Sequence, residues 1–347
     1  MNTLLKSEAV AAGLPARAAP RERRWPLIGL AALLAAACLL PFFISNYRTF
    51  QFTLVLVNAI ALLGINILTG YNGQISLGHG AFYALGAYTT AILIDQLGVP
   101  YWLTVPIAGA VCLVAGFLFG LPALRLHGLY LALATLALGV ATPQLLKYKG
   151  IEEYTGGVQG IVILKPEAPF GLPLNPDQRL YFFSLTIMVL LFALARNLLR
   201  GRVGRAIVAI RDHPIAADAM GINSAMYKSL TFGVSAMYTG IAGALAAIAV
   251  QFVAPDSFAI GLSFAFLFGS VIGGIYSISG ALYGALFLQF VPHLSEGISK
   301  AAPQAIFGVF LILFMFVMPA GIAGFVRLVS ARAALRRRAG AQPAKGG

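Results

Sequence analysis

The sequence predicts an all-α polytopic membrane protein with about ten transmembrane segments, nine long and one short or re-entrant. Of the 347 residues, 59% are hydrophobic and only 10% are charged, whereas soluble domains contain about 25% charged residues. A soluble fold of this length could not bury so much apolar surface. Apolar runs close to the ~20 residues needed to cross a bilayer recur along the chain. These runs lack the period-two alternation of β-barrel strands.

The long apolar runs account for nine of the predicted spans. They occupy residues 26–44, 50–69, 75–94, 101–121, 128–146, 180–199, 230–253, 259–279 and 304–326. A shorter run at 281–294 is either a tenth span or a re-entrant segment. The first run follows a basic stretch that resembles the start of a signal peptide, but its apolar residues continue past Cys38 and further spans follow. We therefore predict an uncleaved first helix.

The basic residues are concentrated in three regions, which predicts the orientation. The net charge is +13, and sixteen of the 24 Lys and Arg residues lie in 1–25, 200–229 and 327–347. Segment 147–179 instead carries four basic and four acidic residues. Because cytoplasmic segments of membrane proteins are enriched in Lys and Arg, both termini and 200–229 are predicted to be cytoplasmic and 147–179 external. Because both termini are predicted on the same side, the number of crossings must be even, which favours ten over nine. The predicted tails at 1–25 and 327–347 flank a transmembrane domain at 26–326.

Residues 70–80 (GYNGQISLGHG) interrupt an apolar region with small and polar residues. The candidate site residues are Asn72, Gly73, Gln74, Ser76, Gly78 and His79. Non-helical backbone at membrane depth is tolerated where it is buried in protein or lines a cavity. A pathway-lining segment and a close-packed glycine-rich crossing are the two interpretations. For His79, a hydrogen-bonded packing role is favoured over contact with a transported solute.

The external segment 147–179 contains "TGGVQGI" at 155–161 followed by four prolines. Such Gly and Pro punctuation indicates turns rather than a folded domain. A cap over an external opening and a plain surface loop are both compatible with it. Among the spans, small residues recur four positions apart, which lets helix backbones approach closely. These pairs are Gly116/Gly120, Gly240/Ala244, Gly269/Gly273 and Gly280/Gly284.

The cytoplasmic segment 201–233 predicts a short surface helix. Asp212 is suited to cap its start, Pro214 to its first turn, and Gly221 to the position after its end. Its apolar face consists mainly of Ala and Met. Helices that lie on lipid prefer bulky apolar residues. We therefore favour insertion of this helix into a groove on a partner protein. The candidate docking residues are Arg211, Asp212, Ala216, Ala217, Ala219, Met220 and Gly221.

The sequence lacks the common short motifs for nucleotide binding, metal binding and hydrolysis. We find no phosphate-binding loop and none of the short motifs of metalloproteases or serine hydrolases. The four His residues are scattered and the two Cys residues lie inside spans, so neither a metal site nor a catalytic site is predicted. Carboxylates are also rare within the spans, which argues against a proton-coupled secondary carrier. Glu296 and His293 are the only candidates for such a role.

Several stretches together resemble a known family. They are "GYNGQISLGHGAFYALGAYTTAIL" (70–93), "LRLHGLYLALATLALG" (124–139), "TGGVQGI" (155–161), "GRAIVAIRDHPIAADAMGINSAMYK" (204–228), "GGIYSISGALYGA" (273–285) and "PAGIAG" (319–324). They resemble the LivM-like permease subunits of branched-chain amino acid ABC importers, over roughly residues 50–326. The resemblance implies a subunit of the bacterial inner membrane without catalytic activity or cofactors of its own.

The resemblance also implies partners. They are a second, LivH-like permease, two ATP-binding cassette subunits that bind the ATP, and a periplasmic substrate-binding protein. The segment 204–228 would dock on the ATPase, and 70–80 would line the pathway for an amino acid or a related small polar solute. A stand-alone secondary carrier and a membrane-embedded enzyme are the alternatives, and nucleic acid is not an expected partner.

Overall fold

The computed structural model describes residues 25–126, 128–164, 175–298, 303–318 and 320–339. The chain divides into two units, 1–45 and 46–347. In the first unit the structure describes helix α2 (Trp25–Phe43), which contains Pro41. The second unit contains the remaining elements.

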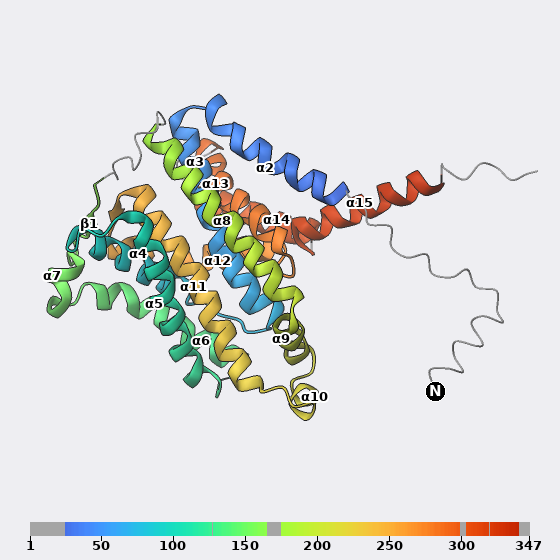
Figure 1. The fold of residues 1–347 in the computed structure, drawn as a ribbon, viewed down its shortest axis with the longest axis horizontal. Coiled ribbons are helices and arrows are strands. Elements are labelled where there is room, and N and C mark those ends of the chain that lie inside the picture. The colour runs from blue at the N-terminus through green and yellow to red at the C-terminus, as the bar shows by residue number, and fades with distance from the viewer. Residues whose placement is uncertain (1–24, 127, 165–174, 299–302, 319, 340–347) are drawn as a thin grey trace, which may run out of the picture. The chain divides into compact units, whose positions relative to one another are not determined.

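The second unit consists almost entirely of helices (Figure 1). They are α3 (Asn46–Ile65) with a π-helical extension η1 (Asn66–Tyr71), α4 (His79–Asp95), α5 (Tyr101–Ala123), α6 (Leu129–Leu146), η2 (Lys149–Ile151), α7 (Glu152–Thr155), α8 (Pro176–Arg200), α9 (Arg202–Asp212), α10 (Pro214–Ala219), α11 (Ser224–Val250), η4 (Pro255–Phe258), α12 (Ile260–Gly273), α13 (Ile278–Ile298), α14 (Pro303–Val317) and α15 (Gly321–Ala339). The strands β1 (Ile161–Val162) and β2 (Phe252–Val253) pair antiparallel, with Ile161 opposite Val253.

Six helical stretches in the described part of the chain are long and apolar enough to cross a membrane. They are Asn46–Tyr71, Tyr101–Ala123, Leu129–Leu146, Pro176–Arg200, Ser224–Val250 and Pro255–Gly273. An all-α polytopic membrane protein is therefore confirmed. The number of ten crossings and their orientation stay predictions.

Several predicted spans have wrong boundaries, and the run 75–94 is one of them, because α4 begins only at His79. The run 304–326 is not one helix, because α14 ends at Val317 and α15 begins at Gly321, which adopts a φ of 71°. The run 259–279 ends early, at the turn around Gly274 (φ 110°). The short run 281–294 belongs to the 21-residue helix α13, which is long enough for a span by length alone.

Helix α11 forms the centre of the unit and packs against α3, α4 and α5. Lipid tails are as apolar as side chains, so close packing rather than hydrophobic burial holds membrane helices together. Small residues provide that packing here. A Cβ added to Gly86 on α4 would collide with the backbone of Gly240 on α11, and one added to Gly116 on α5 would collide with Ala236. The prediction of close helix contacts from small residues is confirmed at these positions.

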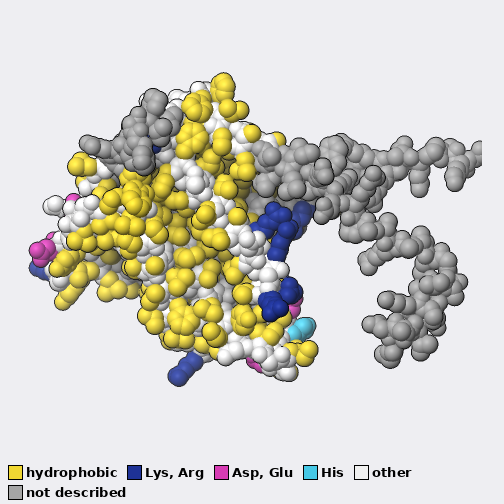
Figure 2. Space-filling view, in the orientation of Figure 1, with side chains coloured by type: hydrophobic (Ala, Val, Ile, Leu, Met, Phe, Trp, Pro, Cys, Tyr) yellow, Lys and Arg dark blue, Asp and Glu magenta, His cyan; other side chains and the backbone are white. Residues whose placement is uncertain are grey.

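The two connecting segments with contrasting charge lie at opposite ends of α8, a helix of 25 residues and roughly 37 Å at 1.5 Å per residue. The end near α7 carries β1 paired with β2, and Lys147 Nζ lies 2.5 Å from Asp256 Oδ1 there. Figure 2 shows charged side chains at two ends, with Lys and Arg prominent near α9 and an acidic group near α7, and an apolar surface between the two ends. That separation is the pattern expected of a membrane-spanning bundle.

Candidate translocation and docking site

The glycine-rich stretch predicted from the sequence is a break between a complete helical span and a helix that starts inside the bundle. Helix α3 and η1 run without interruption from Asn46 to Tyr71, and α4 starts only at His79. His79 forms a hydrogen bond with Ser235 on α11. Ser235 lies about 16 Å along α11 from the start of that helix at Ser224. The backbone of 72–78 is therefore non-helical within the bundle.

Hydroxyl side chains from neighbouring elements bond to the backbone of this non-helical segment and of the first turn of α4. The Thr135 Oγ1 atom accepts a 2.9 Å hydrogen bond from the Leu77 amide, and the Ser263 Oγ atom accepts a 3.0 Å bond from the Gly80 amide. Thr69 Oγ1 donates to the Gln74 carbonyl at 3.0 Å. These three residues were not predicted from the sequence. Ser and Thr within apolar spans were the available signal, since they often bond to backbone in membranes.

The predicted residues of the break divide into two groups, and the first packs against other helices. His79 is buried, and its Nε2 atom lies 2.8 Å from Ser235 Oγ, which itself donates to the Gly64 carbonyl. Because the Ser235 hydroxyl proton is donated to the Gly64 carbonyl, His79 Nε2 is the donor in its hydrogen bond with Ser235. Ser76 is buried and accepts a bond from the Gly78 amide. A Cβ on Gly78 would lie 2.5 Å from the Thr135 carbonyl oxygen.

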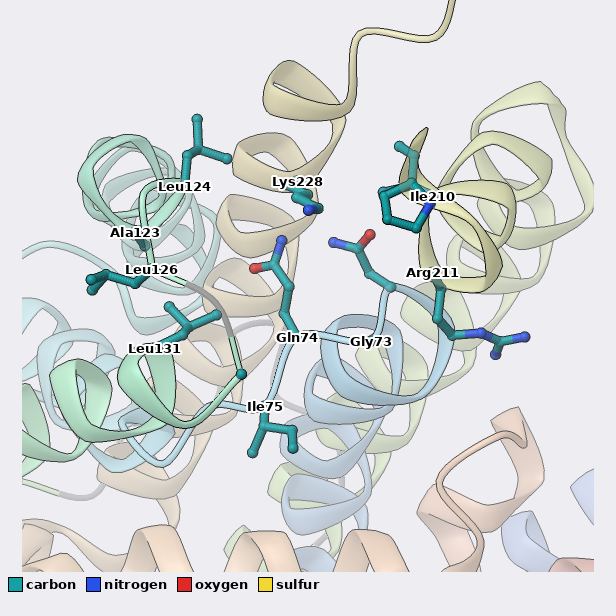
Figure 3. Close-up of a pocket in the computed structure, with 13 residues that line it drawn as sticks. Gly73, Gln74, Ile75, Ala123, Leu124, Leu126, Leu131, Ile210, Arg211 and Lys228 are labelled. Atoms are coloured by element: carbon teal, nitrogen blue, oxygen red, sulfur yellow. The ribbon is translucent and has the colours of Figure 1, made fainter. Parts of the chain in front are cut away.

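The second group, Asn72, Gly73 and Gln74, lines a cavity of about 170 Å³ (Figure 3). Asn72 is 2% exposed, and neither atom of its amide has a hydrogen-bond partner. Buried polar groups are normally paired, so this amide is an exception among the lining residues of the cavity. The remaining lining residues are Ile75, Ala123, Leu124, Leu126, Gly128, Leu131, Ile210, Arg211, Pro214 and Lys228. The cavity thus lies between the break, the α5–α6 connection and the segment predicted to dock on a partner.

The predicted docking helix is α10, a six-residue helix whose first residue is Pro214, as expected. The predicted capping role of Asp212 is wrong. Asp212 is the last residue of α9, and its carboxylate pairs with Arg211 at 2.8 Å, whereas His213 precedes α10.

The end of α10 agrees with the prediction from Gly221. Its φ is 81°, its amide donates to the Asp218 carbonyl at 3.0 Å, and the Ile222 amide donates to the Ala217 carbonyl at 3.1 Å. These two bonds form a Schellman motif.

The predicted docking residues differ in accessibility. Ala216, Ala219, Met220 and Gly221 are exposed in this chain, and Met220 reaches 84%. Ala217 faces inward and is 4% exposed. The apolar surface that α10 offers to a partner therefore excludes Ala217.

Arg211 also points into the chain, where it connects the docking segment to the break. Its Nη1 atom donates to the Gly70 carbonyl at 2.9 Å, and its guanidinium lies 5.4 Å from the centre of the Tyr276 ring. The aliphatic part of the Arg211 side chain packs closely against Gly73, since a Cβ on Gly73 would lie 2.8 Å from Arg211 Cγ. One side chain thus contacts the end of η1, the break and the turn between α12 and α13.

That turn is itself tied to the π-helical extension through residues missed in the sequence. Asn66 Nδ2 donates to the Ser277 carbonyl at 3.0 Å, and Ser270 Oγ donates to Asn66 Oδ1 at 2.5 Å. Arg327 on α15 donates to Ser277 Oγ at 2.6 Å. A lone Asn in an apolar run was the signal, because intramembrane polar residues usually have a partner.

Comparisons with known proteins agree with this architecture. A family model described as branched-chain amino acid transport system / permease component matches residues 47–319. The high-affinity branched-chain amino acid transport system permease protein LivM of Escherichia coli (strain K12) is 35% identical over 321 residues, covering 86% of this chain and 75% of the relative. LivH of the same organism is 26% identical over 283 residues, covering 77% of this chain and 91% of the relative.

A more distant similarity involves part of the chain only. The guanosine ABC transporter permease protein NupQ of Bacillus subtilis (strain 168) is 34% identical over 117 residues, covering 33% of this chain and 36% of the relative. No solved structure matches the chain. The match to the family model spans most of the chain and includes the break, the cavity and the docking segment, so the chain belongs to the family of branched-chain amino acid transport system permease components.

Proposed function

We propose that this chain is the LivM-type permease subunit of an importer that moves branched-chain amino acids across the bacterial inner membrane. Separate ATPase subunits supply the energy and dock on α10. A LivH-like permease completes the membrane part, and a periplasmic binding protein delivers the solute. The relatives are transport permeases, and the sequence offers neither a nucleotide-binding loop nor a catalytic cluster.

The observation that carries this proposal is the direct bond between the docking segment and the broken span. Arg211 at the end of α9 holds the Gly70 carbonyl at the end of η1. An ATPase that moves α10 would therefore displace the break, and with it the cavity lined by Asn72 and Gln74. This is a physical route from ATP hydrolysis to the transport pathway, which a carrier working alone would not need.

Uptake measurements test this proposal. The chain is co-expressed with its companion permease, ATPases and binding protein, and uptake of labelled leucine, isoleucine and valine is measured in vesicles. We expect ATP-dependent accumulation that disappears when the ATPase is omitted. Accumulation driven by an ion gradient without ATP would instead identify a stand-alone carrier. Transport of urea or aromatic amino acids with no branched-chain uptake would refute the solute assignment.

Cysteine labelling tests the proposed orientation, with both termini and 200–229 cytoplasmic. Val158 on the external segment and Ala216 on α10 are both exposed. Single cysteines at these positions, with Cys38 and Cys112 replaced by Ala, are treated with a membrane-impermeant maleimide. Val158→Cys should react in intact cells, and Ala216→Cys only after permeabilisation. The reverse pattern would invert the topology, and retained uptake of the background variant serves as the control.

A further inference from the structure

The cavity beside the break has one polar wall and one apolar wall. The amides of Asn72 and Gln74 and the ammonium of Lys228 belong to the polar wall, and the Gln74 side chain extends toward Lys228 (Figure 3). The apolar wall consists of Ala123, Leu124, Leu126 and Leu131, whereas Ile210 lies across the cavity beside Arg211 (Figure 3). At about 170 Å³, the cavity is smaller than the pockets of drug-sized ligands, at roughly 300–1,000 Å³, and suits a small solute.

The polar wall contains unused hydrogen-bonding capacity. The buried Asn72 amide has a free donor and a free acceptor. Among the described residues, no carboxylate lies within ion-pair distance of Lys228. The other cation of the lining, Arg211, is already engaged by Asp212 and the Gly70 carbonyl. The cavity therefore presents one uncompensated positive charge together with an amide that lacks partners.

We propose that this cavity binds a zwitterionic amino acid with a branched aliphatic side chain, entering or leaving on the cytoplasmic side. The Lys228 ammonium pairs with the ligand's carboxylate. The carbonyl oxygens of the Asn72 and Gln74 amides accept hydrogen bonds from its α-ammonium, and the apolar wall packs against its side chain. Gly73 and Ile75 are exposed at the rim, so the cavity is open to that side. The choice of amino acid rests on the proposed function.

A ligand in this cavity would touch two elements at once. Asn72 and Gln74 belong to the break, whereas Ile210, Arg211 and Pro214 belong to the docking segment. Occupancy would therefore restrain the position of α9 and α10 relative to the break. Accumulated amino acid in the cytoplasm would then slow the importer by holding its docking segment in one position.

The test measures binding of radiolabelled leucine to the complete importer in phosphatidylcholine nanodiscs, with the binding protein left out. We expect saturable binding that Lys228→Met weakens about tenfold or more, because a charge-assisted hydrogen bond is lost. Lys228→Arg should retain most of the affinity. The matched control is Lys149→Met, an exposed lysine near α7. Leucinamide, which lacks the carboxylate, should compete poorly, and 4-methylpentanoate, which lacks the ammonium, should compete at an intermediate level.

Several outcomes would overturn the inference. They are the absence of saturable binding, equal affinity in Lys228→Met, and competition by inorganic phosphate as strong as that by leucine. Loss of leucine binding in phosphatidylglycerol nanodiscs would assign Lys228 to a lipid headgroup instead. Uptake by the same complex with its binding protein is measured in parallel. Normal uptake without this binding refutes the cavity alone, whereas absent uptake refutes the proposed function.

Discussion

Replacing Arg211 with Ala is expected to reduce leucine uptake at least about tenfold while the ATPase stays bound. The change removes the 2.9 Å bond to the Gly70 carbonyl and the contact with the Tyr276 ring. A hydrogen bond from a charged group contributes about 1.5–3 kcal/mol, and a tenfold change corresponds to about 1.4 kcal/mol. ATP hydrolysis should continue but lose its stimulation by the loaded binding protein, because α10 would move without moving the break.

The controls separate coupling from general damage. Arg205→Ala removes another arginine of α9 that is exposed and bonds only weakly, at 3.5 Å, to the Arg200 carbonyl, so uptake should be unchanged. Arg211→Lys should restore part of the uptake, since an ammonium reaches one acceptor but lacks the planar fork. If Arg211→Ala releases the ATPase, the residue belongs to the docking contact itself. If uptake is normal, the link has no role in coupling.

The positions of the break and of the docking helix α10 could be predicted from the sequence, because local residue types determine them. Gly73 and Gly221 both adopt positive φ, which favours glycine, and Pro214 begins α10. Local pattern also identified the break at 70–80. It did not reveal which distant residues complete that break, because Thr135 and Ser263 reach it only through the packing of α6 and α12.

Arg211 illustrates the same limit in another way. On sequence grounds it belonged with the docking residues, since it precedes α10 in a basic cytoplasmic segment. Its long side chain instead turns toward Gly70, 141 positions earlier in the chain. Hydropathy likewise joined α14 and α15 into one span, because the positive φ at Gly321, where α15 begins, does not change the apolar composition of the run.

The second large effect is expected at α10, where Ala216→Arg should release the ATPase from the purified importer. Ala216 is exposed on the small face that also includes Ala219 and Met220. An arginine there would place a long charged side chain in a contact that fits a methyl group, and an unpaired charge in an interface costs several kcal/mol. Val158→Arg is the matched control, an exposed position at the opposite end of the molecule, and should leave the complex intact.

Gly221 provides an independent variant of the same test, because its effect depends on backbone conformation alone. No atom lies within 4 Å of a Cβ added at this residue, but its φ is 81°. Val disfavours that conformation by roughly 1–2 kcal/mol or more, whereas Asn tolerates it. Gly221→Val should therefore displace α10 and weaken ATPase retention and uptake together, while Gly221→Asn keeps both. Full ATPase retention and normal uptake in Ala216→Arg and Gly221→Val would mean that α10 rests on lipid, and the ATPase would have to dock elsewhere.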